Sequence, residues 1–233
     1  TNQSIKWLQR AGPMARNYAP VLNSMNHTTI AIGRDASRAA EFQNDTKITT
    51  ITGNMADAVN KHGISTAIVV VPTLSLAAVT IELINAGVKK ILVEKPGAAN
   101  LMELKELNLV ADQNGADVYI AYNRRFFASA IKAREIIAED LGAQLITFNF
   151  TELSDKIESL NYPRRLTENI FFNNSVHVVD LALSFGELPE DVFVSSAGEL
   201  PWHSKGATFA GHAKTTSGLL YSFCADWRGG GRC

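Results

Sequence analysis

The feature that most constrains the fold is an alternation, repeated through the first half of the chain, of short apolar runs with longer amphipathic stretches. Residues 67–71 are almost entirely β-branched and lie between polar residues, which is typical of a parallel strand buried on both faces. Residues 75–85 then carry apolar side chains at every third or fourth position, as in a helix that packs on a sheet. This repeated order of strand and helix predicts βαβ units and a doubly wound parallel sheet.

The other runs of the first half fit the same pattern. Further strands are predicted at residues 5–8, 29–32, 47–52, 90–93 and 117–121, and further helices at residues 36–43, 54–61 and 101–113. The first part of the chain is therefore predicted to be a doubly wound α/β domain.

The pattern changes in the second half. Residues 144–152 alternate between apolar and polar side chains, and residues 219–227 do the same after a turn at residues 216–218. This alternation is typical of antiparallel strands with one covered and one open face. With helices predicted at residues 128–139 and 175–185, the second part is predicted to be an α+β domain with an antiparallel sheet.

The open face of that sheet is predicted to form a contact between subunits. It carries Leu145, Thr147 and Asn149, a mixture of polarity that suits such a contact. The neighbouring strand presents either the odd-numbered or the even-numbered residues of 219–224 on this face, and the sequence leaves both possibilities open. We expect the intact protein to be a homodimer or a homotetramer.

Composition and charge exclude several classes of function. The chain has 22 Lys+Arg and 23 Asp+Glu, a net charge of −1, so it lacks the basic excess that binds nucleic acid or an anionic membrane. Its longest apolar run is far shorter than the ~18 residues of a membrane span, and no secretory signal opens the sequence. Two cysteines, Cys224 and Cys233, fit neither a disulfide framework nor a zinc site. We expect a cytoplasmic protein and, because it ends in a glycine run, a fragment.

Polar or turn-forming clusters follow several of the predicted strands. These clusters are residues 11–15, 33–35, 71–73, 94–96 and 122–126. Open α/β sheets bind their ligands at the carboxyl ends of the strands, where the strand order reverses. The convergence of the clusters on one edge predicts a ligand site there.

Two of these clusters carry a resemblance to a known family. Residues 91–98, Ile-Leu-Val-Glu-Lys-Pro-Gly-Ala, and residues 122–126, Tyr-Asn-Arg-Arg-Phe, resemble the Gfo/Idh/MocA oxidoreductases. The likeness continues through residues 150–152, 174–181, 202–203 and 225–227, and is nearest to the branch associated with polysaccharide and sugar-nucleotide biosynthesis. It implies a Rossmann domain at residues 1–124 and, at residues 125–233, an α+β domain for substrate binding and oligomerisation that is truncated at its C-terminus.

The resemblance implies hydride transfer between NAD or NADP and a secondary alcohol or ketone of a sugar or sugar nucleotide. The alternative is a non-catalytic Rossmann-type protein that binds a nucleotide or a sugar as a sensor or subunit. Two departures from the family's pattern favour this alternative. Arg10 stands where the family has the first glycine of its phosphate-binding turn, and Asn173 stands where it has an aspartate.

Lys95 and His177 are the candidate catalytic residues. Lys95 ends a predicted buried strand and precedes Pro96, so a partly desolvated amine with a lowered pKa could exchange a proton near neutral pH. His177 begins an amphipathic helix and could take a proton from a substrate hydroxyl. The alternatives are a surface lysine before a turn and a helix-capping histidine, and the resemblance favours catalysis for both residues.

The predicted cofactor contacts follow from the strand ends and from the resemblance. They are Gly12, Pro13, Met14, Gly33, Arg34, Pro72, Thr73, Glu94 and Asn123. Gly33 occupies the position where NAD enzymes usually place an acidic residue, and an arginine beside it can pair with the 2′-phosphate of NADP. We expect NADP or NAD, with NADP favoured.

Contacts to the substrate are predicted for five residues. They are Arg125, Arg164, Asn173, Asp180 and Trp202. Arg164 and Trp202 lie in predicted loops of the second domain, where they could bind a sugar-nucleotide pyrophosphate and ring, or be ordinary surface residues. His177 and Asp180 have the spacing of metal ligands but lack a second ligand pair, so we predict no metal site.

Overall fold

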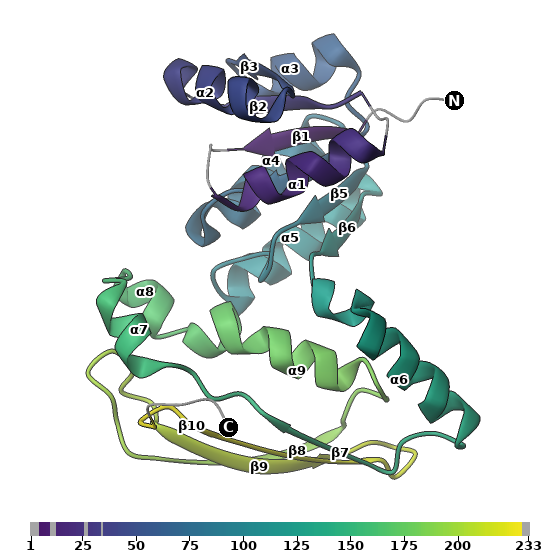
Figure 1. Ribbon diagram of the computed structural model, residues 1–233, viewed down its shortest axis with the longest axis vertical. Coiled ribbons are helices and arrows are strands. Elements are labelled where there is room, and N and C mark those ends of the chain that lie inside the picture. Colours follow the sequence, from purple (N-terminus) through teal and green to yellow (C-terminus); the bar gives the residue numbers. More distant parts are fainter. Residues whose placement is uncertain (1–4, 10–12, 26–27, 34, 230–233) are drawn as a thin grey trace. The chain divides into compact units, whose positions relative to one another are not determined.

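The chain forms two compact units, Thr1–Ala121 and Tyr122–Cys233 (Figure 1). The structure is a computed structural model and describes residues 5–9, 13–25, 28–33 and 35–229. Within these ranges, no helix is both long and apolar enough to cross a membrane. Each unit is described by itself.

The N-terminal unit is built on six parallel strands in the order β3-β2-β1-β4-β5-β6. The strands are β1 (Ile5–Gln9), β2 (Ile30–Gly33), β3 (Thr49–Thr52), β4 (Thr66–Val70), β5 (Lys90–Val93) and β6 (Asp117–Ile120). The helices are α1 (Pro13–Ser24), α2 (Ala36–Thr46), α3 (Met55–His62), the 3₁₀ turn η1 (Thr73–Ser75), α4 (Leu76–Asn85) and α5 (Leu101–Asn114). This arrangement confirms the predicted doubly wound sheet, whose strand order reverses between β1 and β4.

Helices cover both faces of this sheet, as successive residues of β4 show. Ala67 and Val69 lie in one core with residues of α3, α4 and α5. Ile68 and Val70 lie in a second core with residues of α1 and α2. All four side chains are buried. Because both faces of β4 need an apolar cover, its sequence is an unbroken apolar run and does not alternate.

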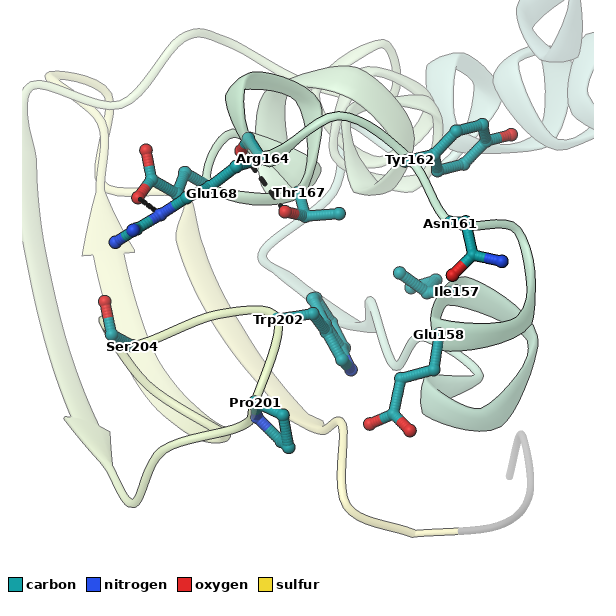
Figure 2. Close-up of a pocket in the computed structure, with 10 residues that line it drawn as sticks. All are labelled: Ile157, Glu158, Asn161, Tyr162, Arg164, Thr167, Glu168, Pro201, Trp202 and Ser204. Carbon is teal, nitrogen blue, oxygen red and sulfur yellow. Dashed lines mark hydrogen bonds and ion pairs between the residues drawn. The ribbon is translucent and has the colours of Figure 1, made fainter.

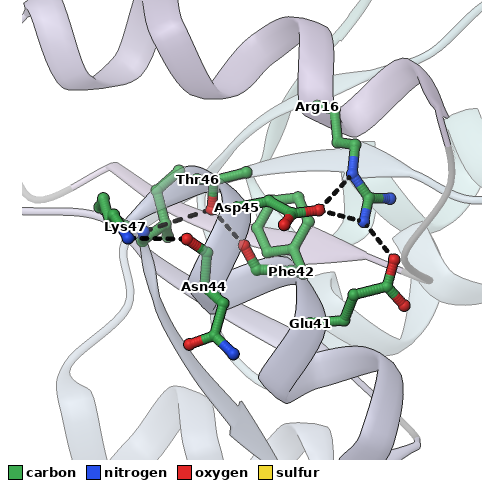
Figure 3. Close-up of polar contacts among 8 residues, drawn as sticks. Arg16, Glu41, Phe42, Asn44, Asp45, Thr46 and Lys47 are labelled. Atoms are coloured by element: carbon green, nitrogen blue, oxygen red, sulfur yellow. Dashed lines mark hydrogen bonds and ion pairs between the residues drawn. The ribbon is translucent and has the colours of Figure 1, made fainter.

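Arg16 links α1 to α2 (Figure 3). Its guanidinium donates to Glu41 Oε1 at 2.8 Å and to Asp45 Oδ2 at 2.7 Å, on neighbouring turns of α2. Exposed ion pairs of this kind contribute only about 0–1 kcal/mol each. The two helices are therefore held mainly by the buried Phe42, which shares the core of Ala15 and Leu22.

The C-terminal unit has a four-stranded sheet in the order β7-β10-β9-β8. The strands are β7 (Leu145–Asn149), β8 (Asp191–Ala197), β9 (Thr208–Lys214) and β10 (Leu220–Asp226). The helical segments are η2 (Asn123–Phe126), α6 (Ala128–Glu139), α7 (Ser154–Ser159), α8 (Arg164–Thr167), the π-helix η3 (Phe171–Ser175) and α9 (Val176–Leu183).

One strand departs from the predicted antiparallel arrangement. β7 pairs with β10 in parallel, whereas β10, β9 and β8 pair antiparallel, so the sheet is mixed. β7 and β8 consequently run in the same direction, and strands so related need a long crossover instead of a tight turn. The segment that contains α7, α8, η3 and α9 supplies this crossover.

The register of β7 and β10 identifies the open face of this sheet. Leu145, Thr147 and Asn149 lie beside the even-numbered residues 220, 222 and 224 of β10, and all six are exposed. Ile146 and Phe148 point to the opposite face, where they pack with Tyr221 and with Leu183 of α9. Of the two alternatives for β10, the even-numbered side therefore shares the open face.

Aromatic rings fill the covered face around Gly211. The Phe223 ring lies next to Gly211 and stacks on Phe148, with a centroid distance of 5.4 Å and an interplanar angle of 28°. A Cβ at position 211 would lie 2.5 Å from Cε2 of Phe223 and closer still to the backbone oxygen of Phe193. Since a backbone oxygen of β8 cannot move away without distorting the sheet, the position requires glycine.

We expect Gly211→Ala to lower the free energy of unfolding of this unit by about 1–3 kcal/mol, the usual cost of overpacking. Chemical denaturation followed by tryptophan fluorescence measures it, because Trp202 and Trp227 belong to this unit. Ala210→Ser, at the exposed neighbouring position of β9, is the control and should change stability by less than about 0.5 kcal/mol. Equal effects of the two substitutions would contradict the packing argument.

Candidate functional site

The carboxyl edge of the parallel sheet brings together several of the predicted cofactor residues. α1 begins at Pro13, and Met14 in its first turn is exposed. Gly33 ends β2, while Pro72 and Thr73 begin the turn η1 after β4. Gly12 and Arg34, like Arg10, lie outside the described residues. The free N–H groups at the start of a helix favour an anion, so the edge between β1 and β4 suits a phosphate group.

Glu94 lies at the same edge, directly after β5, and both oxygens of its carboxylate accept hydrogen bonds. The Tyr18 hydroxyl on α1 donates to Glu94 Oε1 at 2.7 Å. The Lys95 amide donates to Glu94 Oε2 at 3.2 Å. Glu94 thus connects α1 to the backbone of Lys95, which joins Pro96 through a cis peptide bond. Sequence reasoning missed Tyr18, because nothing in the sequence of α1 indicates a partner 76 residues away.

In the C-terminal unit, His177 is the second residue of α9 and packs against Tyr122. The Tyr122 ring meets the imidazole edge-on, with centroids 6.1 Å apart and an interplanar angle of 76°. Burial raises the pKa of Tyr122 to about 12; the charge of Asp180 adds to this shift and Arg125 opposes it. The phenol of Tyr122 therefore stays protonated at neutral pH beside His177.

Arg125 and Asp180, both predicted to contact substrate, pair with each other. The guanidinium donates through Nη2 to Asp180 Oδ1 at 2.5 Å and through Nε to Oδ2 at 2.8 Å. Only 7% of the Asp180 side chain is exposed, against 45% of Arg125. Arg134 of α6 donates in turn to the Arg125 backbone oxygen. The Arg125–Asp180 pair therefore ties η2 to α9, one turn beyond His177. Contact of Arg125 or Asp180 with the substrate stays a prediction.

A buried carboxylate that sequence reasoning missed stands beside the π-helix. Glu152 is 4% exposed and accepts hydrogen bonds from Ser175 Oγ at 2.6 Å and from Asn174 Nδ2 at 2.7 Å. Asn173, also buried, donates from its amide to the Leu166 backbone oxygen at 3.0 Å. The segment that leads into His177 is therefore fixed by buried polar contacts, in a π-helical turn of the kind often found at functional sites.

Arg164 and Trp202 line one cavity of about 540 Å³ in the C-terminal unit (Figure 2). Figure 2 shows Trp202 between the residues of α8 on one side and those of α7 and its following turn on the other. His177, Asn173 and Asp180 are not among the residues that line this cavity, and neither is the exposed Asn123. In the part of the chain that the structure describes, no group of three or more His, Cys, Asp or Glu side chains could hold a metal ion.

Comparison with known families gives a match for the N-terminal part of the chain. Residues 11–122 match the Gfo/Idh/MocA model, described as an oxidoreductase family with an NAD-binding Rossmann fold. The N-terminal unit is therefore similar to the NAD-binding Rossmann domains of this family. The match confirms the resemblance on which the sequence-based prediction of an oxidoreductase fold depended. No curated protein sequence matches the chain.

Solved structures share the fold of the chain at low sequence identity. A putative NADPH-dependent oxidoreductase from Desulfitobacterium hafniense has a TM-score of 0.80 and 15% identity, covering 97% of this chain and 68% of that one. The WlbA dehydrogenase from Chromobacterium violaceum, solved with NADH and UDP-GlcNAcA, has a TM-score of 0.75 and 17% identity, and the match covers 97% of this chain and 68% of that one. A myo-inositol 2-dehydrogenase from Lactobacillus plantarum has a TM-score of 0.74 and 18% identity, and the match covers 97% of this chain and 71% of that one.

The contact between Tyr18 and Glu94 predicts an alkaline transition. Burial, followed by the hydrogen bond to Glu94 and the charge of its carboxylate, raises the pKa of Tyr18. The unfolded chain therefore loses this phenolic proton first, and the stability that Tyr18 contributes declines as the pH rises above about 10. We expect Glu94→Gln to lower the pKa of Tyr18 without restoring its ordinary value, because burial persists.

Alkaline titration of the tyrosinate absorbance measures this change, and Tyr18→Phe identifies which transition belongs to Tyr18. A Tyr18 transition that is the same in Glu94→Gln and in the unchanged protein would contradict the role given to Glu94.

Proposed function

We propose that the protein is an NAD(P)-dependent oxidoreductase that transfers a hydride between the nicotinamide and a secondary alcohol or ketone of a sugar or sugar nucleotide. The single observation that carries this proposal is the family match of a unit whose parallel sheet reverses its strand order between β1 and β4. The substrate class is supported by similar structures named for myo-inositol and solved with UDP-GlcNAcA. That the protein works in the cytoplasm remains a prediction.

The residues at the carboxyl edge of the first sheet fit a dinucleotide. Gly12 and the start of α1 at Pro13 and Met14 would hold the pyrophosphate. Pro72 and Thr73 at η1 would border the nicotinamide. Asn123, in η2, stays a predicted cofactor contact. Gly33 leaves no carboxylate at the end of β2, and Arg34 follows it. We therefore favour NADP, since an arginine there can pair with the 2′-phosphate.

The side chains of this chain would transfer the proton of the substrate hydroxyl, while the bound nicotinamide would accept or donate the hydride. In the oxidative direction His177 accepts the proton of the substrate hydroxyl, and its ring is oriented by the edge of Tyr122. The Lys95 side chain would stabilise the charge that develops on the substrate, or relay its proton. Glu94, held by Tyr18, fixes the backbone from which Lys95 extends.

We expect Lys95→Ala to lower kcat by about 10²–10⁴, as loss of an acid–base group does, and to leave the affinity for NADPH within a few-fold. Turnover is followed at the absorbance of the reduced nicotinamide with neutral and nucleotide-linked sugars, and cofactor affinity by calorimetry. Lys90→Ala, at the exposed opposite end of β5, is the matched control.

Retention of most of kcat in Lys95→Ala would remove the role given to Lys95. Binding of NADPH or NADH with no turnover of any sugar would instead favour the alternative of a non-catalytic binding protein.

We also propose that the open face of the second sheet forms the contact of a homodimer or homotetramer. Leu145 and Leu220 lie side by side on this face and are 60% and 47% exposed. We expect Leu145→Asp to shift the protein toward the monomer in sedimentation velocity, because a buried carboxylate would oppose association. Leu109→Asp, on the exposed side of α5, should have no effect. An intact, full-length protein that sediments as a monomer before any substitution would contradict the proposal.

A further inference from the structure

The helix that carries His177 begins without a side-chain cap. Ser175, the residue before α9, has a helical backbone with φ −62° and ψ −24°, and its side chain makes no capping hydrogen bond. The π-helix η3 leads directly into α9, and the Val176 amide donates to the backbone oxygen of Phe171, five residues earlier. The direction in which His177 points is therefore set by the turn that precedes it.

A π-helical turn holds one residue more than an α-helical turn, because its hydrogen bonds span five residues instead of four. Successive residues of an α-helix are rotated by about 100°, since one turn takes about 3.6 residues. If η3 changed to α-helical hydrogen bonding, each later residue would move by one position. The His177 imidazole would then point about 100° away from its present direction. The π-helical form is rare, so other contacts must hold it.

Glu152, which follows β7, supplies two such contacts. Its side chain is 4% exposed; Oε1 accepts from Ser175 Oγ at 2.6 Å and Oε2 from Asn174 Nδ2 at 2.7 Å. Both donors belong to η3 and lie two and three residues before His177. A buried carboxylate is costly unless its oxygens are hydrogen-bonded, so the folded unit gains by keeping both donors where they are.

A second contact fixes α9 on the other side of His177. Asp180, one turn further along the helix, accepts two hydrogen bonds from the Arg125 guanidinium. Arg125 is 45% exposed, whereas the contacts of Glu152 are buried. His177 is thus held from both sides, and Glu152 is the group that acts on the π-helical turn itself.

We propose that Glu152 is a positioning residue for His177: through Ser175 and Asn174, its carboxylate holds the π-helical turn that directs the imidazole. That this imidazole accepts a proton rests on the proposed function; the effect of Glu152 on its direction does not. The role depends on the two hydrogen bonds and not on the negative charge of Glu152.

Two substitutions separate the hydrogen bonds from the charge. Glu152→Leu removes both bonds at similar volume. Glu152→Gln removes only the charge, because its oxygen accepts from Asn174 and its NH₂ group donates to the Ser175 hydroxyl. We expect Glu152→Leu to lower kcat about 100-fold, as displacement of a reacting group does, and Glu152→Gln to keep kcat within about threefold. The KM for NADPH should stay the same in both.

The pH profile of kcat gives a readout that a general loss of structure would not imitate. The limb that reports ionisation of His177 should persist in Glu152→Gln and be lost in Glu152→Leu. In a His177→Ala background, Glu152→Leu should lower the remaining turnover by less than about twofold, because two residues that act through one group are not additive. Glu139→Leu, at an exposed carboxylate of α6, is the matched control.

Thermal melts show whether each variant folds. If Glu152→Leu has no cooperative melt, Ser175→Ala takes its place, since it removes only the bond to Oε1. We expect Ser175→Ala to lower kcat about tenfold, in the same direction and with the same change of pH profile.

Modification of His177 by diethyl pyrocarbonate, located by mass spectrometry, tests the proposal without turnover. Its rate should change severalfold in Glu152→Leu and stay the same in Glu152→Gln. Equal rates in all proteins, or a loss of kcat in Glu152→Gln as large as that in Glu152→Leu, would overturn the proposal. Absence of sugar turnover by the unchanged protein, together with altered His177 reactivity in Glu152→Leu, would contradict the proposed function and support the positioning role.

Discussion

The burial of β4 on both faces is the constraint on which the N-terminal unit depends. Its side chains alternate between two cores, one with α3, α4 and α5 and the other with α1 and α2. A parallel strand in this position can be covered only if the connecting helices return on both sides of the sheet. The chain must then start near the middle of the sheet and proceed outward in both directions, which places the reversal of strand order beside β1 and β4. The proposed dinucleotide site is thus a consequence of burying β4 on both faces.

The sheet of the C-terminal unit buries apolar side chains on one face only. Its aromatic layer joins Phe148 and Phe223 to Phe150 and Trp227, and the opposite face of the sheet stays exposed. Two polar contacts fix the elements around His177: the Arg125–Asp180 pair ties η2 to α9, and Glu152 accepts a hydrogen bond from Ser175 in the turn before it. Rigid apolar packing thus holds buried charges in place, each with a specific partner.

Periodicity predicted most elements of the first unit, because both of its signals are local, but it missed α1 (Pro13–Ser24). An unbroken apolar run indicates a buried strand, and a spacing of three or four indicates a helix, so the predicted helix at residues 101–113 differs from α5 by one residue. The direction of β7 could not be predicted, because it depends on the crossover that follows it. β8 and β9 were missed because Asp191–Ala197 is exposed throughout and Thr208–Lys214 contains Gly211. The cavity beside Trp202 could not be predicted either, since the segments that line it meet only after the sheet has formed.

β8 lies at the edge of the second sheet and pairs only with β9 among the described strands. It carries three consecutive apolar residues, Val192, Phe193 and Val194, which are 54–60% exposed, and no lysine or proline interrupts them. Natural sheets usually protect such an edge with charge, a bulge or a covering segment. The outer N–H and C=O groups of β8 are thus a template on which another extended segment can add itself. In concentrated solution this edge makes the chain prone to self-association by strand addition, a route to aggregation that is independent of the open face and of any ligand.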